Sequence, residues 1–146
     1  KYSCYAHCCM MVEVHVDEDL GIIRVARVVN ASAAGKIINP KTAENQLLGA
    51  TVWGIGMALE EEGMVDKNLG RIMNANLAEY HIPVHADIKN IEIIFVEEKD
   101  DIVNPLGAKG VGELGMVGVA AAISNAVYNA TGKRIKELPI KLDHLL

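Results

Sequence analysis

The glycine-rich run at residues 105–115, PLGAKGVGELG, is the segment with the clearest chemical potential. It holds four glycines and one lysine directly before a stretch with helical periodicity. Glycine permits positive φ angles and lets backbone amides approach a ligand, and the N-terminus of a following helix adds partial positive charge. The run therefore favours an anionic ligand held by backbone N–H groups.

Glu113 is the one carboxylate in this run. A carboxylate beside a helix N-terminus complements the helix dipole, which stabilises the helix by about 0.3–1 kcal/mol without any further role. The apolar neighbours Val111 and Leu114 also favour partial desolvation of Glu113, which suits a carboxylate to act as a general base. The residues alone leave both roles open.

The same run contains the spacing G-x-G-x-x-G at Gly110, Gly112 and Gly115, which is found in dinucleotide-binding folds. In those folds the motif leaves directly from a β-strand, whereas the strand predicted at residues 91–96 ends well before Gly110. No βαβ unit with a suitably placed acidic residue follows. The context disfavours nucleotide binding, which stays an alternative to be tested.

Two N-terminal strands are the first of the elements that would position this run. Residues 10–16 (MMVEVHV) alternate apolar and polar side chains, and residues 22–29 (IIRVARVV) are rich in β-branched side chains. Residues 17–21 between them have turn chemistry. This pattern predicts a β-hairpin, followed by a small-residue loop at residues 30–39.

A helix of about 20 residues is predicted next, because apolar residues recur at three- and four-residue steps over residues 42–62. Pro40 stands where prolines open helices. Gly49, Gly54 and Gly56 each destabilise a helix interior by up to about 1 kcal/mol, so we expect them to permit close packing. We expect Trp53 in the core, and Glu60, Glu61 and Glu62 on a solvated face.

The C-terminal half is predicted to contain a short hairpin within residues 63–76, a strand at residues 91–96 and a loop at residues 99–109. A second amphipathic helix is predicted at residues 115–131. The elements lack the regular alternation of a doubly wound sheet. We therefore predict an α+β fold with a mixed or antiparallel sheet and two main helices, forming one domain over residues 1–146.

Composition restricts the class of protein. The chain has 146 residues, of which 51% are hydrophobic, and a formal net charge of −5. This length and hydrophobic fraction fit one domain. The net negative charge, spread along the sequence without a long basic run, gives no basic surface for nucleic acid. No apolar stretch approaches the ~20 residues of a membrane span, and the sequence from Lys1 lacks an export signal. We expect a soluble protein.

A metal site built by the protein alone is disfavoured. Cys4, Cys8 and Cys9 lie close to His7 and His15, but their spacing lacks the paired C-x2-C arrangement that zinc prefers. An odd number of cysteines near one end also predicts no disulfide framework. Further along, Pro83 between His81 and His85 favours extended chain, so these two histidines are expected to be ordinary polar residues.

A family resemblance adds to these interpretations. Residues 105–115 and residues 119–140 (VAAAISNAVYNATGKRIKELPI) resemble the C-terminus of the molybdenum-binding subunit of the xanthine dehydrogenase and aldehyde oxidase family. Residues 5–29 resemble the family's opening hairpin, residues 38–62 its glutamine-containing helix, and residues 76–98 its following strands. NLAEYHIPVHAD and NPLGAKGVGELG are most similar to bacterial periplasmic aldehyde oxidoreductases. The resemblance implies a C-terminal piece of a longer subunit.

The resemblance implies roles for particular residues. Glu113 corresponds to the catalytic glutamate that takes a proton from a molybdenum-bound hydroxide while aldehydes or N-heterocycles are oxidised with water. Gln46 corresponds to the glutamine that hydrogen-bonds the pterin. The amides expected beside the metal belong to Lys109, Gly110, Val111 and Gly112. Ser32 and Ala33 stand where many members have a His-Asp pair, and Cys8 and Cys9 replace bulkier residues.

Cofactors, partners and compartment follow from the same resemblance. It implies a molybdenum-pterin cofactor, either molybdopterin or its cytosine dinucleotide, with iron-sulfur clusters and FAD on other domains or subunits. The expected partners are the remainder of the subunit and those electron-transfer subunits, in the cytoplasm or in a periplasm reached through a partner's export signal. The chain alone is expected to be inactive. The alternative is a cofactor-free interaction domain that kept the fold and self-associates.

Overall fold

The computed structural model describes residues 2–146, and Lys1 lies outside the described residues. The elements in chain order are β1 (His7–Asp17), β2 (Ile22–Ala33), α1 (Pro40–Leu59), β3 (Val65–Asp66), β4 (Arg71–Ile72), β5 (Ile91–Phe95), α2 (Val119–Thr131) and a single 3-10 turn η1 (Leu142–His144). This arrangement confirms the predicted α+β class with two main helices.

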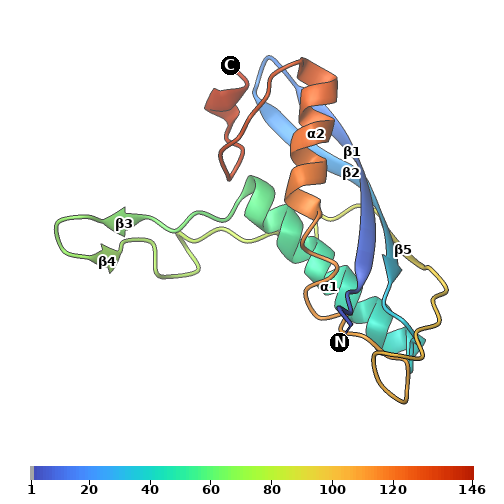
Figure 1. Cartoon of the computed structure of the whole chain (residues 1–146). Helices are drawn as coiled ribbons and strands as arrows, with labels where there is room; N and C mark the ends of the chain where they lie inside the picture. The colour runs from blue at the N-terminus through green and yellow to red at the C-terminus, as the bar shows by residue number, and fades with distance from the viewer. Residues whose placement is uncertain (1) are drawn as a thin grey trace.

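The main sheet is mixed and has the strand order β1-β2-β5. β1 and β2 form the predicted antiparallel hairpin, and β5 adds to β2 in parallel, with Val28 opposite Ile91 and Ser32 opposite Phe95. Helix α2 packs against β1, whereas α1 packs against β2, β5 and α2 (Figure 1). The helices therefore bury the face of the sheet from which β1 contributes Met10 and Val12 to the core.

The core lies between this face and the two helices. Val28, Val119, Ile123 and Val127 are all fully buried and belong to one hydrophobic cluster. Burying a side chain of this size contributes about 1.5–3 kcal/mol, so this cluster is the main stabilising contact between strands and helices.

Helix α1 begins as its sequence predicts. The side chain of Asn39 accepts a hydrogen bond from the amide of Thr42, and Pro40 occupies the first turn. A Cβ atom on Gly54 would lie 2.6 Å from Val119, so the expected close packing holds where α1 crosses α2. It also holds at Gly56, which packs against Pro83, but not at Gly49, which has no neighbouring atom within 4 Å.

Helix α2 starts later than predicted, at Val119 rather than residue 115. Residues 112–118 form successive turns in which the amide of Met116 bonds the carbonyl of Glu113 and the amide of Val119 bonds the carbonyl of Met116. Gly132 ends the helix as predicted, with a φ of 73° and its amide bonded to Tyr128. Glu113 is therefore not at a helix N-terminus.

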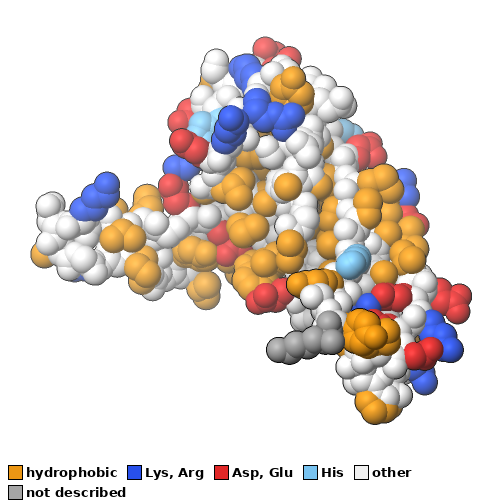
Figure 2. Space-filling view, viewed as in Figure 1, with side chains coloured by type: hydrophobic (Ala, Val, Ile, Leu, Met, Phe, Trp, Pro, Cys, Tyr) orange, Lys and Arg blue, Asp and Glu red, His pale blue; other side chains and the backbone are white. Residues whose placement is uncertain are grey.

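Residues 63–80, here called the arm, project away from the sheet and helices and contain the predicted short hairpin of β3 and β4 (Figure 1). Asn74 is buried at its base, where it accepts from the amide of Met64 at 2.9 Å and donates to the carbonyl of Glu62 at 2.6 Å. The rest of the arm carries exposed apolar side chains (Figure 2). Among them, Leu77 is 85% exposed.

Two expectations about α1 are corrected. Trp53 is 49% exposed rather than in the core, because the faces of α1 that meet the sheet and α2 are formed by Leu47, Thr51 and Gly54. Glu60, Glu61 and Glu62 are partly buried rather than simply solvated, and the last two of them also have side-chain partners. Glu61 accepts a hydrogen bond from the Tyr80 hydroxyl at 2.7 Å, and Glu62 pairs with Lys141 at 2.8 Å.

None of the helices in residues 2–146 combines the length and apolar character needed to cross a membrane.

Candidate functional site

The glycine-rich run is fastened at its start to the end of β2. The amide of Lys109 donates to the carbonyl of Ala34 at 3.0 Å, and the amide of Lys36 donates to the carbonyl of Gly107 at 2.8 Å. Gly35 has a φ of +64°, and a Cβ atom there would lie 2.1 Å from the oxygen of Gly107. Only glycine permits this crossing of the two segments.

A second attachment holds the run beyond Glu113. Gly115 packs so closely on α1 that a Cβ atom would lie 2.8 Å from the carbonyl oxygen of Leu47 and 2.9 Å from Ala50. The buried hydroxyl of Thr51 lies 2.8 Å from the carbonyl of Leu47 and 3.3 Å from that of Gly115, so its single proton is shared between them. The turn that carries Glu113 therefore rests directly on α1.

Thr51 belongs to a buried polar network that sequence reasoning missed. The amide nitrogen of Asn30 donates to the Thr51 hydroxyl at 3.2 Å, and the Ser32 hydroxyl donates to Asn30 at 2.7 Å. These three side chains are at most 1% exposed. The available signal was the alternation in β2, because Val28, Asn30 and Ser32 lie on the same inward face.

Gln46 is the residue that joins α1 to the middle of the run. Its side-chain nitrogen donates to the carbonyl of Gly112 at 3.3 Å. Gln46, Lys109, Val111 and Gly112 also line one open cavity of about 490 Å³. The structure thus brings together most of the residues predicted to bind the cofactor, while Gly110 lies in the same loop beside them.

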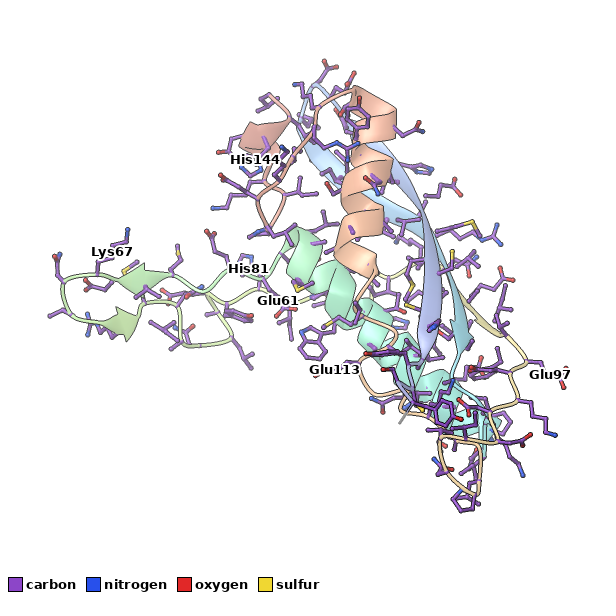
Figure 3. The ribbon with its side chains drawn as sticks, viewed as in Figure 1. Glu61, Lys67, His81, Glu97, Glu113 and His144 are labelled. Carbon is purple, nitrogen blue, oxygen red and sulfur yellow. The ribbon has the colours of Figure 1, made fainter. Side chains whose placement is uncertain are left out.

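Glu113 follows Gly112 and lies beside α1 (Figure 3). Its side chain is exposed, although Val111 and Leu114 on either side are half-buried. The expected desolvation of Glu113 is therefore absent from this chain, because the segments that pack around the turn leave the carboxylate uncovered. The carboxylate belongs to the same turn that Gln46 contacts.

The glycines of this loop fit a ligand that approaches the backbone. Gly110 and Gly112 have no neighbouring atom within 4 Å of an added Cβ. Contrary to expectation, neither has a positive φ, and Gly107 is the only glycine of residues 105–115 with a positive φ. Packing and backbone conformation within residues 2–146 therefore do not require these two glycines. Their amides and that of Val111 also bond no acceptor in this part of the chain. An anionic group would fill the space and pair with the amides.

The side chain of Lys109 does not supply the positive charge of this cavity. It is 7% exposed and forms ion pairs with Glu98 and, at 3.1 Å, with Asp100. The hydrogen bond with Glu98 raises the pKa of Lys109, and hydrogen bonds lower the pKa values of both carboxyl groups. The side chain of Lys109 is thus engaged by two carboxylates, and its backbone amide, which was expected beside the metal, already bonds the carbonyl of Ala34. Sequence reasoning missed Glu98 and Asp100.

Protein side chains alone form no metal centre in the described part of the chain, since no three His, Cys, Asp or Glu residues there are grouped to hold an ion. Cys4, Cys8 and Cys9 are free thiols, and burial followed by the neighbouring Cys9 raises the pKa of Cys8. His81 and His85 are exposed.

Comparison with known proteins identifies the family to which this arrangement belongs. Residues 1–89 match the family described as molybdopterin cofactor-binding domain. The chain is 54% identical over 135 residues to the aldehyde oxidoreductase molybdenum-binding subunit PaoC of Escherichia coli, covering 92% of this chain and 18% of that subunit. It is 39% identical to the putative xanthine dehydrogenase molybdenum-binding subunit XdhA of the same organism, covering 90% of this chain and 17% of XdhA.

Solved structures agree with this relationship. The aldehyde oxidoreductase from Desulfovibrio desulfuricans superimposes with a TM-score of 0.87 at 32% identity, covering 99% of this chain and 16% of that one. The chain thus spans about 18% of the length of the curated relatives named above. On the match of residues 1–89 and these relatives, the chain belongs to the molybdopterin cofactor-binding domain family of aldehyde oxidoreductase and xanthine dehydrogenase molybdenum-binding subunits.

Proposed function

We propose that this chain is the C-terminal domain of a molybdenum hydroxylase that oxidises aldehydes or N-heterocycles with water as the oxygen source. Glu113 is the general base of this reaction. The observation that supports the proposal is the hydrogen bond from the side-chain nitrogen of Gln46 to the carbonyl of Gly112, the residue before Glu113. The aldehyde oxidoreductase names of the relatives favour an aldehyde substrate.

The residues of the cavity fit a molybdenum-pterin cofactor, as molybdopterin or its cytosine dinucleotide. The amides of Gly110, Val111 and Gly112 would hold its anionic groups, and Gln46 would bond the pterin through the side-chain oxygen that its contact with Gly112 leaves available. When bound, this cofactor supplies the two-electron redox chemistry. Backbone amides suit this task because they are fixed by the fold and need no reorganisation during the reaction.

Glu113 would accept a proton during this reaction. In the overall reaction an aldehyde and water give a carboxylic acid, two protons and two electrons, so the oxygen of water must lose protons as it bonds the substrate carbon. A positioned carboxylate that accepts one of them accelerates such a step by about 10²–10⁴-fold. Because Glu113 is exposed in this chain, the remainder of the subunit would have to cover it, and the chain alone would be inactive.

The test is Glu113→Gln in the complete enzyme. We expect kcat to fall by at least about 100-fold while molybdenum content stays near normal, because the substitution removes the base but preserves shape and hydrogen bonding. Glu18→Gln is the matched control, since Glu18 is an exposed glutamate in the β1–β2 turn. Activity near normal in Glu113→Gln would remove the assignment.

The proposed partners are the remainder of the molybdenum subunit and subunits that carry iron-sulfur clusters and FAD. Exposed apolar side chains such as Leu77 at 85% and Val117 at 69% support contacts with further protein. Relatives are named as a gamma subunit and a large subunit. We propose a cytoplasmic location, with export on a partner's signal as the alternative.

The same exposed apolar surface favours a second candidate, a cofactor-free interaction domain that retains the fold. Metal analysis of the protein purified with its natural partner subunits separates the two candidates. Molybdenum together with iron supports the enzyme, and the absence of both metals supports the interaction domain. Measurable dinucleotide affinity in isothermal titration would instead favour the nucleotide-binding alternative.

A further inference from the structure

We propose that Glu98 and Asp100 are positioning residues, which hold the side chain of Lys109 away from the cofactor cavity so that backbone amides alone meet the anionic group. This inference rests on the proposed function and assigns a new role at the same site. The three side chains are here called the acid-lysine clamp.

The side chain of Lys109 is held in one direction by its acidic neighbours. Its ammonium group meets Glu98 and Asp100, which line a different cavity of about 650 Å³ together with Gly107. That cavity contains neither Gln46 nor Glu113. The ammonium group of Lys109 is therefore directed at these two carboxylates, although Lys109 is also among the residues that line the cavity of Gln46 and Gly112.

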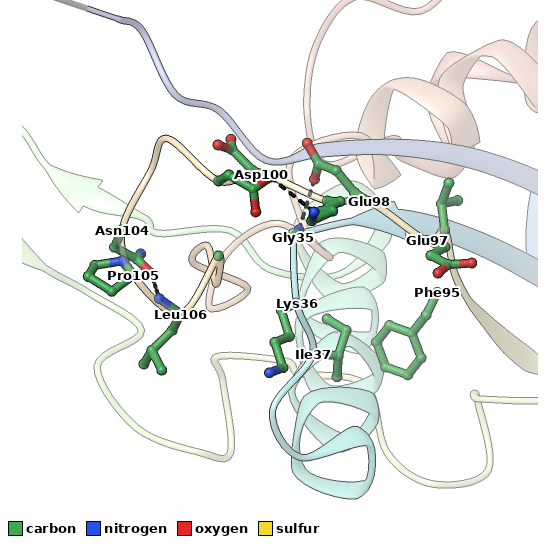
Figure 4. Close-up of a pocket in the computed structure, with 14 residues that line it drawn as sticks. Gly35, Lys36, Ile37, Phe95, Glu97, Glu98, Asp100, Asn104, Pro105 and Leu106 are labelled. Carbon is green, nitrogen blue, oxygen red and sulfur yellow. Dashed lines mark hydrogen bonds and ion pairs between the residues drawn. The ribbon is translucent and has the colours of Figure 1, made fainter.

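Glu98 joins the two segments that cross at the site. One carboxylate oxygen bonds Lys109. The other accepts from the amide of Gly35 at 2.8 Å (Figure 4). Gly35 lies just beyond β2, whereas Lys109 opens the amide loop. A single half-buried carboxylate thus fixes the loop relative to the sheet.

Asp100 is held in a fixed orientation by backbone amides. Its Oδ1 accepts from the amides of Ile102 and Val103 at 2.9 and 3.0 Å, which leaves Oδ2 for Lys109 at 3.1 Å. The side chain of Asp100 is 18% exposed and that of Glu98 is 30% exposed. Water therefore screens these charges less than it would at the surface.

Charge balance explains why the three groups act together. Two carboxylates and one ammonium leave one net negative charge behind the loop, and removal of Lys109 would leave two. Both uncompensated carboxylates would repel an anionic cofactor and each other. Loss of the carboxylates would instead release a lysine able to reach the cofactor. Either change should displace the amides of Val111 and Gly112.

The experiment uses three variants of the complete enzyme. They are Lys109→Met, the double variant Glu98→Gln with Asp100→Asn, here called the carboxamide pair, and the triple variant that combines all three substitutions. Lys109→Arg is the conservative rescue. Lys99→Met is the matched control, because Lys99 forms an exposed ion pair with Asp101 in the same loop. The readouts are molybdenum and pterin content per subunit, the electron paramagnetic resonance spectrum of the molybdenum, and kcat/KM.

We expect Lys109→Met and the carboxamide pair each to lower kcat/KM by about 10-fold or more and to alter the molybdenum spectrum, as outer-shell substitutions do. Combining all three should recover most of the loss, because no uncompensated charge remains. Lys109→Arg should retain cofactor content, and Lys99→Met should leave every readout unchanged.

Two results would overturn the proposal. The first is a carboxamide pair with normal cofactor content, spectrum and kcat/KM. The second is a triple variant as impaired as Lys109→Met, which would mean that the lysine acts on the cofactor directly. The carboxamide pair keeps the question open to experiment even if Lys109→Met fails to fold. Failure of the base assignment is separate, because it appears as retained activity in Glu113→Gln.

Discussion

The side-chain nitrogen of Gln46 lies 3.3 Å from the carbonyl oxygen of Gly112 and donates to it, although 66 residues separate them in the chain. This contact connects the middle of α1 with the turn of Glu113. Gln46 and Gly112 both line the same cavity, so a ligand bound there would touch α1 and this turn together.

Gln46→Ala should lower cofactor content and kcat/KM by about 10-fold or more in the complete enzyme, since it removes a ligand and frees the Gly112 carbonyl. Asn45→Ala is the control, because Asn45 is an exposed amide next to it on α1. Metal analysis and steady-state kinetics measure the effect. Equal cofactor content in Gln46→Ala and wild type would contradict a ligand role.

Gly112→Ala and Gly115→Ala should affect different properties, cofactor content in the first and stability of the fold in the second. The first adds a methyl group where no atom lies within 4 Å, so thermal stability should stay unchanged while cofactor content falls. The second forces a Cβ atom to 2.8 Å from the carbonyl of Leu47 and should destabilise the fold by about 1–3 kcal/mol. Denaturant unfolding with metal analysis checks both. Normal cofactor loading in Gly112→Ala would show that the space is not used.

Thr51→Val should cost about 1–3 kcal/mol of unfolding free energy, because it leaves Asn30 and the carbonyl of Gly115 without their buried partner. Thr51→Ser keeps the hydroxyl and should retain more of this stability. Urea unfolding of the three proteins gives the comparison. If the valine variant were as stable as wild type, the network would not be holding the turn.

Glu60→Gln should stabilise the protein in a pH-dependent manner. Burial, followed by the nearby Asp87, raises the pKa of Glu60 above its ordinary value of 4.5, although His81 acts in the opposite direction. Below pH 4.5 the carboxyl is protonated in both folded and unfolded states, and the wild type loses stability as pH rises through the raised pKa. The variant avoids this loss.

We therefore expect the Tm of Glu60→Gln to exceed that of wild type by a few degrees at pH 7, and the difference to disappear at pH 4. Thermal unfolding at the two pH values is the measurement, with Glu18→Gln as the control for loss of an exposed charge. A constant difference across this range would assign the effect to something other than titration of Glu60.

Sequence periodicity predicts most elements of this fold because most of its strands and helices have one apolar face. It fails where hydrogen bonds replace hydrophobicity, as in the last part of β2, where Asn30 and Ser32 are buried through Thr51. Periodicity also places the start of α2 too early, at residue 115 rather than Val119. Gly115 belongs instead to a turn that packs on Leu47.

The candidate site is less predictable from the residues themselves. The chemistry of a glycine-embedded carboxylate follows from types and spacing, but the pairing of Gln46 with the Glu113 turn was indicated only by family resemblance. No local pattern links Lys109 with Glu98 or reveals that β5 pairs with β2 in parallel, because these contacts join segments from separate parts of the chain.

The parallel pairing of β5 with β2 imposes an order on folding. β1 and β2 are neighbours in sequence and can pair as soon as both are synthesised, whereas β5 can join only after α1 and the arm have been made. Closing so long a loop is entropically costly and slow relative to hairpin formation. Until it closes, β2 keeps one edge open to another strand, so a nascent chain that stalls before residue 91 exposes an edge at which aggregation can begin.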